Sequence, residues 1–153
     1  MNELKRACIE LQLQTMRAEA GTDVAALAWR DEAGRGIRWI SASGNRNERY
    51  KHMLLKPGRG LTGIVFRIGQ PVVFDSDVPE YQVMRHEYPI ILSEQLQTAV
   101  LLPVKLGNET CGVLLLGSRV SLPDTKALLR IAAGMPERIA ALIQNPMDAT
   151  ALT

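Results

Sequence analysis

Apolar residues recur at helical spacing near both ends of the chain. Between residues 3 and 20 they return every three or four positions, with charged and polar residues between them, and Gly21 ends the run. A second amphipathic stretch, residues 125–143, follows a capping sequence and predicts a C-terminal helix, which Gly134 and Pro136 are expected to kink. The repeating positions of the first stretch are Leu4, Ala7, Cys8, Leu11, Thr15 and Ala18.

Two pairs of apolar segments have the length of β-strands and are joined by turn residues, as in β-hairpins. The first pair flanks a turn at residues 31–34, and the second flanks the turn signal Gly107-Asn108. A further short strand follows Gln70-Pro71 and ends before Asp75. The predicted strands span residues 24–29, 36–43, 72–74, 98–106 and 109–116.

The stretch between the hairpins is interrupted by glycine and proline and has helical segments. Residues 61–68 show helix spacing after a glycine-rich turn, and Pro89 suits the first turn of another helix. Residues 78–87 form an irregular or helical connection between these segments. The order of elements predicts an α+β fold, with a central antiparallel sheet of about five to six strands. The N- and C-terminal helices are expected on one face, and the helical excursion is expected to cover a ligand on the other.

Length and composition favour a single domain over residues 1–144, followed by a tail at residues 145–153. Lys and Arg number 18 and Asp and Glu 16, and the basic residues are scattered, so we expect no nucleic-acid partner. No apolar run approaches the roughly 20 residues that span a bilayer. Cys8 and Cys111 lie far apart without a Cys-x-x-Cys motif, which indicates neither a disulfide framework nor a zinc site. These features predict a cytoplasmic protein that has no metal and does not bind a membrane.

Two predicted helix starts carry candidate anion-binding chemistry. Gly60, Leu61, Thr62 and Gly63 begin a helix whose first amides lack partners and carry partial positive charge. The segment Pro89, Ile90 and Ile91 begins a second helix, whose donors are expected to face the same point. A site of neutral donors suits a small monovalent anion, whereas phosphate normally calls for Lys or Arg as well.

Side chains elsewhere complete this interpretation. Trp39 projects from a strand and is expected to supply an indole N–H or a wall, and Leu54, Val65 and Ile90 are expected to exclude water. Each feature also has a purely structural interpretation. The glycines at 58 and 60 suit a tight turn, Trp39 suits a core, and Pro89 suits any helix start. Four basic residues either steer an anion or form a solvated face: Arg46, Arg49, Lys51 and Arg59.

Several phrases of the sequence resemble the GAF domain family. They are the glycine-rich phrase at residues 54–65, the Ile-Gly-Gln-Pro phrase that opens residues 68–75, and the hairpin segments 99–104 and 111–117. The resemblance covers residues 1–144 and implies the α+β fold described above. It also implies a sensory domain that binds a small molecule.

Within GAF proteins, residues 39–50 and 88–96 are most similar to stand-alone nitrate receptors of the Nre type. This resemblance implies a non-enzymatic sensor that binds nitrate, needs no cofactor and modulates a partner sensor histidine kinase. It implies that nitrate is held largely by main-chain amides around Leu61-Thr62 and Pro89-Ile90-Ile91, beside Trp39. A homodimer through the terminal helices is also expected.

Other GAF functions remain as alternatives. A free methionine sulfoxide reductase needs a nucleophilic and a resolving thiol close together, and the positions of Cys8 and Cys111 depart from that pattern. The sequence lacks the signature of cyclic-nucleotide GAF domains and a cysteine placed for bilin attachment. A dimerisation module without a functional pocket is the remaining alternative.

Overall fold

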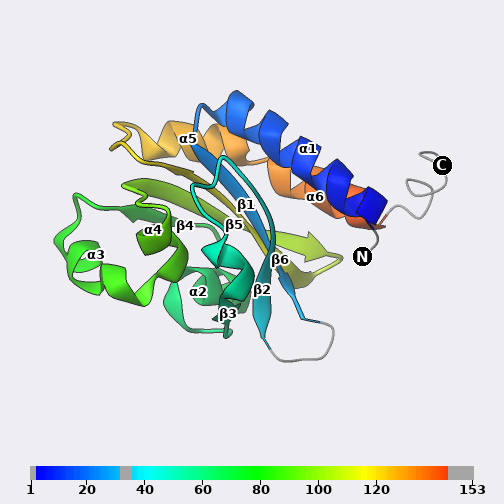
Figure 1. Cartoon of the computed structure of the whole chain (residues 1–153), viewed down its shortest axis with the longest axis horizontal. Coiled ribbons are helices and arrows are strands. Elements are labelled where there is room, and N and C mark those ends of the chain that lie inside the picture. Colours follow the sequence, from blue (N-terminus) through cyan, green and yellow to red (C-terminus); the bar gives the residue numbers. More distant parts are fainter. Residues whose placement is uncertain (1–2, 32–35, 145–153) are drawn as a thin grey trace.

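The computed structural model describes residues 3–31 and 36–144. Within them, six strands form one sheet in the order β3-β2-β1-β6-β5-β4, and neighbouring strands are antiparallel (Figure 1). The predicted α+β class and antiparallel sheet are therefore confirmed. The strands are β1 (Val24–Arg30), β2 (Ile37–Ser43), β3 (Leu54–Leu55), β4 (Val72–Asp75), β5 (Thr98–Leu106) and β6 (Glu109–Ser118).

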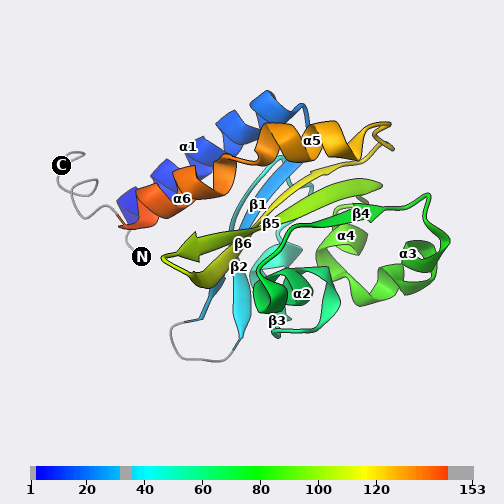
Figure 2. The ribbon, with the colours of Figure 1, turned by 180° about the vertical axis from the view of Figure 1, so that it is seen from behind.

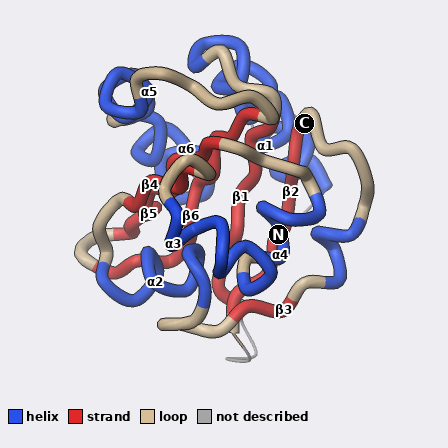
Figure 3. Tube along the Cα trace, turned by 90° about the vertical axis from the view of Figure 1, so that its left-hand side faces the viewer, coloured by secondary structure: helices blue, strands red, loops and turns tan. Residues whose placement is uncertain are grey.

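Helices cover both faces of the sheet. Helices α1 (Glu3–Ala20), α5 (Thr125–Ala132) and α6 (Met135–Gln144) lie together on one face (Figures 1 and 2). The other face carries α2 (Gly60–Ile68), α3 (Pro79–Met84) and α4 (Pro89–Ser93), with the 3-10 helices η1 (Arg49–His52) and η2 (Arg85–Glu87). Figure 3 shows the strands between the two groups. Among the described residues, no helix has both the length and the apolar character needed to cross a bilayer.

The central strands are apolar on both faces because both faces are covered. In β6, Val113 and Leu115 belong to the core on the α2 side, whereas Leu114 and Leu116 belong to the core on the α1 side. This alternation gives each layer of helices its own apolar surface to pack against. Helix α1 supplies Ile9, Leu13 and Met16 to the second core, all fully buried. These are not the repeating positions identified from the sequence, of which Leu11 is 63% exposed, because helical spacing alone does not decide which stripe packs on the sheet.

A bulge in β2 determines which face Trp39 occupies. Trp39 pairs with Ala28 and Ser41 pairs with Leu27, so Ile40 is the extra residue of the strand. Ala28 and Trp39 share the core on the α2 side, whereas Leu27 belongs to the core on the α1 side. The indole therefore lies on the same side of the sheet as α2 and α4.

The structure departs from the predicted elements in two places. The expected kink near Gly134 is a full break between α5 and α6, because Pro136 has no amide donor and its ring excludes the carbonyl of Ala132. Strand β3 is not predicted, since two residues are too few for a periodic pattern. The predicted turn at 31–34 falls mostly outside the described residues.

Gly63 locks α2 to the turn that precedes it. Its carbonyl accepts a hydrogen bond from the amide of Gly58 at 2.8 Å. A β-carbon on Gly63 would collide with the carbonyl oxygen of Lys56. The close approach of these two backbones therefore requires glycine at this position and helps to set where α2 begins.

We expect Gly63→Ala to lower the free energy of unfolding by about 2 kcal/mol, because the turn must move to admit the methyl group. Gly134→Ala is the matched control, since nothing lies within 4 Å of its added β-carbon. Urea unfolding measures both variants. Equal stability of the two would contradict the close packing described here.

Candidate functional site

A cavity of about 240 Å³ opens between the starts of α2 and α4. Its residues come from β3, the turn before α2, the first turn of α2, the junction of η2 with α4, and one position of β5. They are Leu54, Leu55, Lys56, Arg59, Gly60, Leu61, Thr62, Glu87, Tyr88, Pro89, Ile90, Ile91 and Leu101.

The start of α2 presents three amides without helical partners. Gly60 has a φ of 66°, a left-handed conformation that glycine adopts without strain, and this conformation starts the helix. The first amide able to bond inside the helix is that of Gly63, to the carbonyl of Arg59, so the amides of Gly60, Leu61 and Thr62 stay free of helical bonds. These donors, with the dipole of the helix behind them, favour an anion.

The start of α4 adds donors from a second direction. Tyr88 precedes the helix without capping it by its side chain, and Pro89 is its first residue. Proline lacks an N–H, so the first free donors of this helix are the amides of Ile90 and Ile91. With only five residues, α4 contributes little dipole, and its role at the cavity is the local direction of these amides.

Apolar side chains form the inner wall and charged side chains form the mouth. Leu61, Ile90 and Thr62 are each at most 5% exposed, so the inner wall is mostly apolar, and Thr62 and Tyr88 supply its hydroxyls. By contrast, Lys56 and Glu87 are exposed, as is Arg59. The mouth therefore carries two cations and one carboxylate.

An aromatic cluster supports the α4 side of the cavity. The ring of Tyr88 lies 6.2 Å from that of Phe74 and 6.3 Å from that of Tyr81, centroid to centroid. Burial raises the pKa of the Tyr88 phenol, and the neighbouring Tyr81 and Glu87 raise it further. Tyr88 therefore stays neutral at physiological pH and can donate an O–H.

The structure brings six of the eight predicted site residues around this one cavity: Gly60, Leu61, Thr62, Pro89, Ile90 and Ile91. Two predicted residues do not line it. Gly63 is buried against Lys56 and serves the backbone packing described above. Trp39 is 3% exposed and shares a core with Leu61 and Ile90, and its Nε1 is buried without a hydrogen-bond partner.

Some lining residues were not among the predicted site residues. Lys56 and Glu87 lie beside the predicted helix starts, but nothing in their spacing distinguishes them from ordinary surface charges. Leu101 reaches the cavity from β5, which only the sheet order places there. Of the predicted basic cluster, Arg59 alone belongs to the lining, and Lys51 instead pairs with Glu48 at 3.0 Å.

The described residues offer little support for metal or thiol chemistry at this site. They contain no group of three or more His, Cys, Asp or Glu side chains that could hold a metal ion. Cys8 lies on α1 and Cys111 is buried on β6, and neither lines the cavity. The thiol pair that a sulfoxide reductase requires is therefore not found at the cavity.

The fold and the cavity beneath its helical cover are those of a small-ligand sensory domain. The GAF domain family model matches residues 6–142, and the chain belongs to this family. The resemblance drawn from the sequence phrases is thus confirmed.

Solved structures refine this assignment. Two structures of NreA protein from Staphylococcus aureus, mutated in the nitrate binding site, are 35% and 32% identical to this chain. The first match covers 77% of this chain and 89% of the NreA chain, with a TM-score of 0.68. The second covers 81% of this chain and 98% of the NreA chain, with a TM-score of 0.71. A type II free methionine-R-sulfoxide reductase from Thermoplasma acidophilum matches at 15% identity, with coverage of 92% and 93% and a TM-score of 0.71, and shows the fold alone. A comparison with curated protein sequences gives no match.

The raised pKa of Tyr88 predicts a loss of stability in alkali. The unfolded chain releases this proton near pH 10, while the folded protein retains it, so the free energy of unfolding falls as pH rises above about 10. Tyr88→Phe is expected to decline less steeply than the wild type. Urea unfolding between about pH 9 and 11 measures this, and identical slopes would contradict the burial of the phenol.

Proposed function

We propose that this GAF domain binds nitrate, or a similar small monovalent anion, in the cavity between α2 and α4 and acts as a non-enzymatic sensor. One observation carries the proposal: two helix starts, with free amides at Gly60–Thr62 and at Ile90–Ile91, line a single apolar-walled cavity. Neutral amide donors that converge in a dry site stabilise a negative charge there.

The distribution of charge favours a weakly hydrated anion over phosphate. Lys56 and Arg59 are exposed at the mouth with Glu87, and the inner wall carries amides, the hydroxyls of Thr62 and Tyr88, and apolar groups. A phosphate would need a cation in direct contact to offset its double charge. The 32–35% identity to NreA proteins, whose structures concern a nitrate binding site, supports nitrate as the anion.

We assign Trp39 a supporting role in this site. A buried polar atom rarely lacks a hydrogen-bond partner, and Nε1 of Trp39 lacks one. The indole belongs to the same core as the cavity walls Leu61 and Ile90. A bound anion at the inner end of the cavity would supply the missing acceptor.

Signalling is proposed to pass to a sensor histidine kinase in the cytoplasm, by analogy with the Nre-type receptors. Anion binding would shift the population of the cover formed by residues 77–97 or of the terminal helices, provided that the two conformations bind the anion with different affinity. We further propose that residues 1–144 form the functional unit and that the terminal helices support a homodimer.

Calorimetry with nitrate tests the proposal, with chloride, nitrite and methionine sulfoxide as comparison ligands. Saturable one-to-one binding of nitrate, selective over chloride, is expected. Absence of nitrate binding by the folded wild-type protein would overturn the proposal. Binding of methionine sulfoxide instead would support the reductase alternative.

Leu61→Pro is expected to weaken nitrate binding roughly tenfold or more, because it removes one amide donor from the first turn, where proline is sterically tolerated. Leu61→Ala is the matched control, since it shortens the side chain but keeps the amide. Calorimetry compares the two. An equal loss in both variants would show that the side chain, and not the amide, matters.

Trp39→Phe is expected to weaken nitrate binding severalfold, because it keeps an aromatic ring in the core but removes the Nε1–H donor. Denaturant unfolding of the same variant separates a binding effect from a packing effect. Unchanged nitrate affinity would remove Trp39 from the site.

A further inference from the structure

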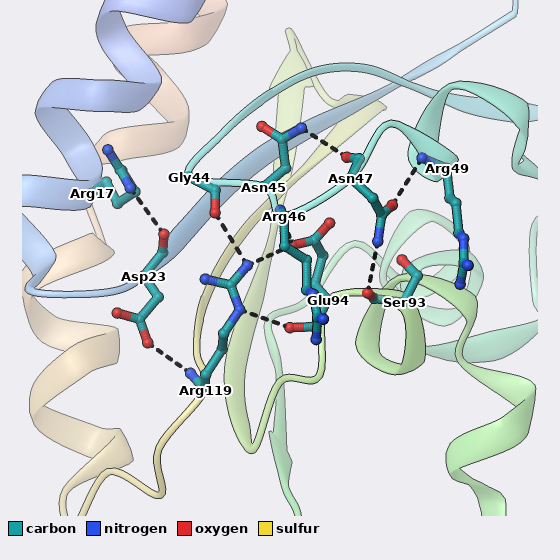
Figure 4. A network of polar contacts seen from close by, with 10 residues as sticks. All are labelled: Arg17, Asp23, Gly44, Asn45, Arg46, Asn47, Arg49, Ser93, Glu94 and Arg119. Atoms are coloured by element: carbon teal, nitrogen blue, oxygen red, sulfur yellow. Dashed lines mark hydrogen bonds and ion pairs between the residues drawn. The ribbon is translucent and has the colours of Figure 1, made fainter.

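An ion pair with a buried carboxylate joins the end of α4 to the residue after β6 (Figure 4). The side chain of Glu94, the residue after α4, is 1% exposed, and its Oε1 accepts a hydrogen bond from Nη2 of Arg119 at 2.6 Å. The amide of Arg46 donates to the same oxygen at 2.7 Å, while Oε2 is buried without a hydrogen-bond partner. A carboxylate this enclosed depends on its arginine, because an unpaired buried charge is strongly unfavourable.

Helix α4 needs such an anchor because it is short and ends in a strained turn. The amides of Gln95 and Leu96 donate to the carbonyls of Leu92 and Ile91 at 3.2 and 3.0 Å, the pattern of a Schellman motif. The residue in the left-handed position is Gln95, with a φ of 54°, where glycine is usual. A five-residue helix with this ending is not stable by itself and is held by its surroundings.

Arg119 also connects α4 to segments beyond it. Its Nε donates to the carbonyl of Glu94 at 3.0 Å, and its Nη2 donates to the carbonyl of Gly44 at 3.1 Å. The amide of Arg119 donates to Oδ2 of Asp23 at 2.8 Å, and Nη1 of Arg17 donates to the carbonyl of Asp23 at 3.0 Å (Figure 4). These bonds form a continuous path from the cavity helix to the last turns of α1, on the other face of the sheet.

The backbone is closely packed where this path crosses Gly44. Gly44 has a φ of 79°, and a β-carbon there would collide with the carbonyl oxygen of Asp23 and with Nη1 of Arg17. A displacement of the α4 end therefore meets rigid backbone at the junction of α1 and β1. Packed elements of this kind transmit small shifts instead of absorbing them.

We propose that Glu94 and Arg119 are a positioning pair: they set the α4 amides at the cavity and couple their position to the C-terminal end of α1. The identity of the ligand rests on the proposed function, but the coupling rests on the contacts above. Movement of α4 on anion binding then changes the exposed end of a terminal helix, the part of the molecule that a partner protein can contact.

Hydrogen exchange of the ligand-free protein tests the coupling directly. Two amides report on its two ends: Leu96 bonds to Ile91 at the end of α4, and Thr22 bonds to Arg17 at the end of α1. Glu94→Gln keeps the side chain's shape and removes its charge. We expect exchange to quicken about tenfold at both amides in this variant, with the amides of the β5–β6 hairpin unchanged.

Arg138→Gln is the matched control. Arg138 of α6 pairs with Glu19 of α1 at 2.7 Å and also donates to Gln12 of α1, so its bonds lie within the terminal helices and Leu96 is expected to exchange as in the wild type. Arg119→Lys keeps the charge and is expected to restore part of the protection that Arg119→Gln loses. A purely local structural role would predict neither the partial rescue by Arg119→Lys nor the change at both Leu96 and Thr22.

The outcomes separate the coupling from the proposed ligand. A change confined to Leu96 in Glu94→Gln, or a uniform change throughout the sheet, would overturn the coupling. Nitrate is expected to slow exchange at Leu96 and Thr22 in the wild type and at Leu96 alone in Glu94→Gln. If nitrate has no effect on the wild type, the proposed function fails, whereas the ligand-free comparison still decides the coupling.

Discussion

Burial of both faces of the central strands is the constraint on which the structure depends. β1, β5 and β6 alternate apolar residues toward two separate cores, and neither face can be left to water. The terminal helices cover one face with closely spaced residues such as Leu13 and Met16. The other face must be covered by the segment between β2 and β5, which is why a long excursion folds back over the sheet.

The two covers are held in different ways. Helices α1 and α6 pack along their length, and Arg138 ties them together. On the opposite face, α3 has no buried residue and α4 has only five residues. Helices α2 and α4 still bury apolar side chains such as Val65 and Ile91 in the core, so α3 is the weakly packed part of this layer. The aromatic cluster and the pair of Glu94 and Arg119 add contacts at the two ends of this segment.

The candidate site lies within this layer of short helices. Its donors are main-chain amides, so its chemistry depends on where two helices begin more than on which side chains they carry. That dependence explains how a cavity with apolar walls can be suited to an anion. It also makes the placement of α4 as important to the proposed binding as any residue in the lining.

The sequence by itself determined most of the elements and the two helix starts at the cavity, because spacing, capping and turn residues act locally. The helix over residues 3–20, both hairpins and the glycine-rich start at Gly60–Thr62 all follow from short-range pattern. Only the tertiary structure decided that the starts of α2 and α4 share one cavity, that a bulge places Trp39 on the same side of the sheet, and that Glu94 meets Arg119 across 25 positions of chain. These features depend on the packing of distant backbones, and no local pattern carries that information.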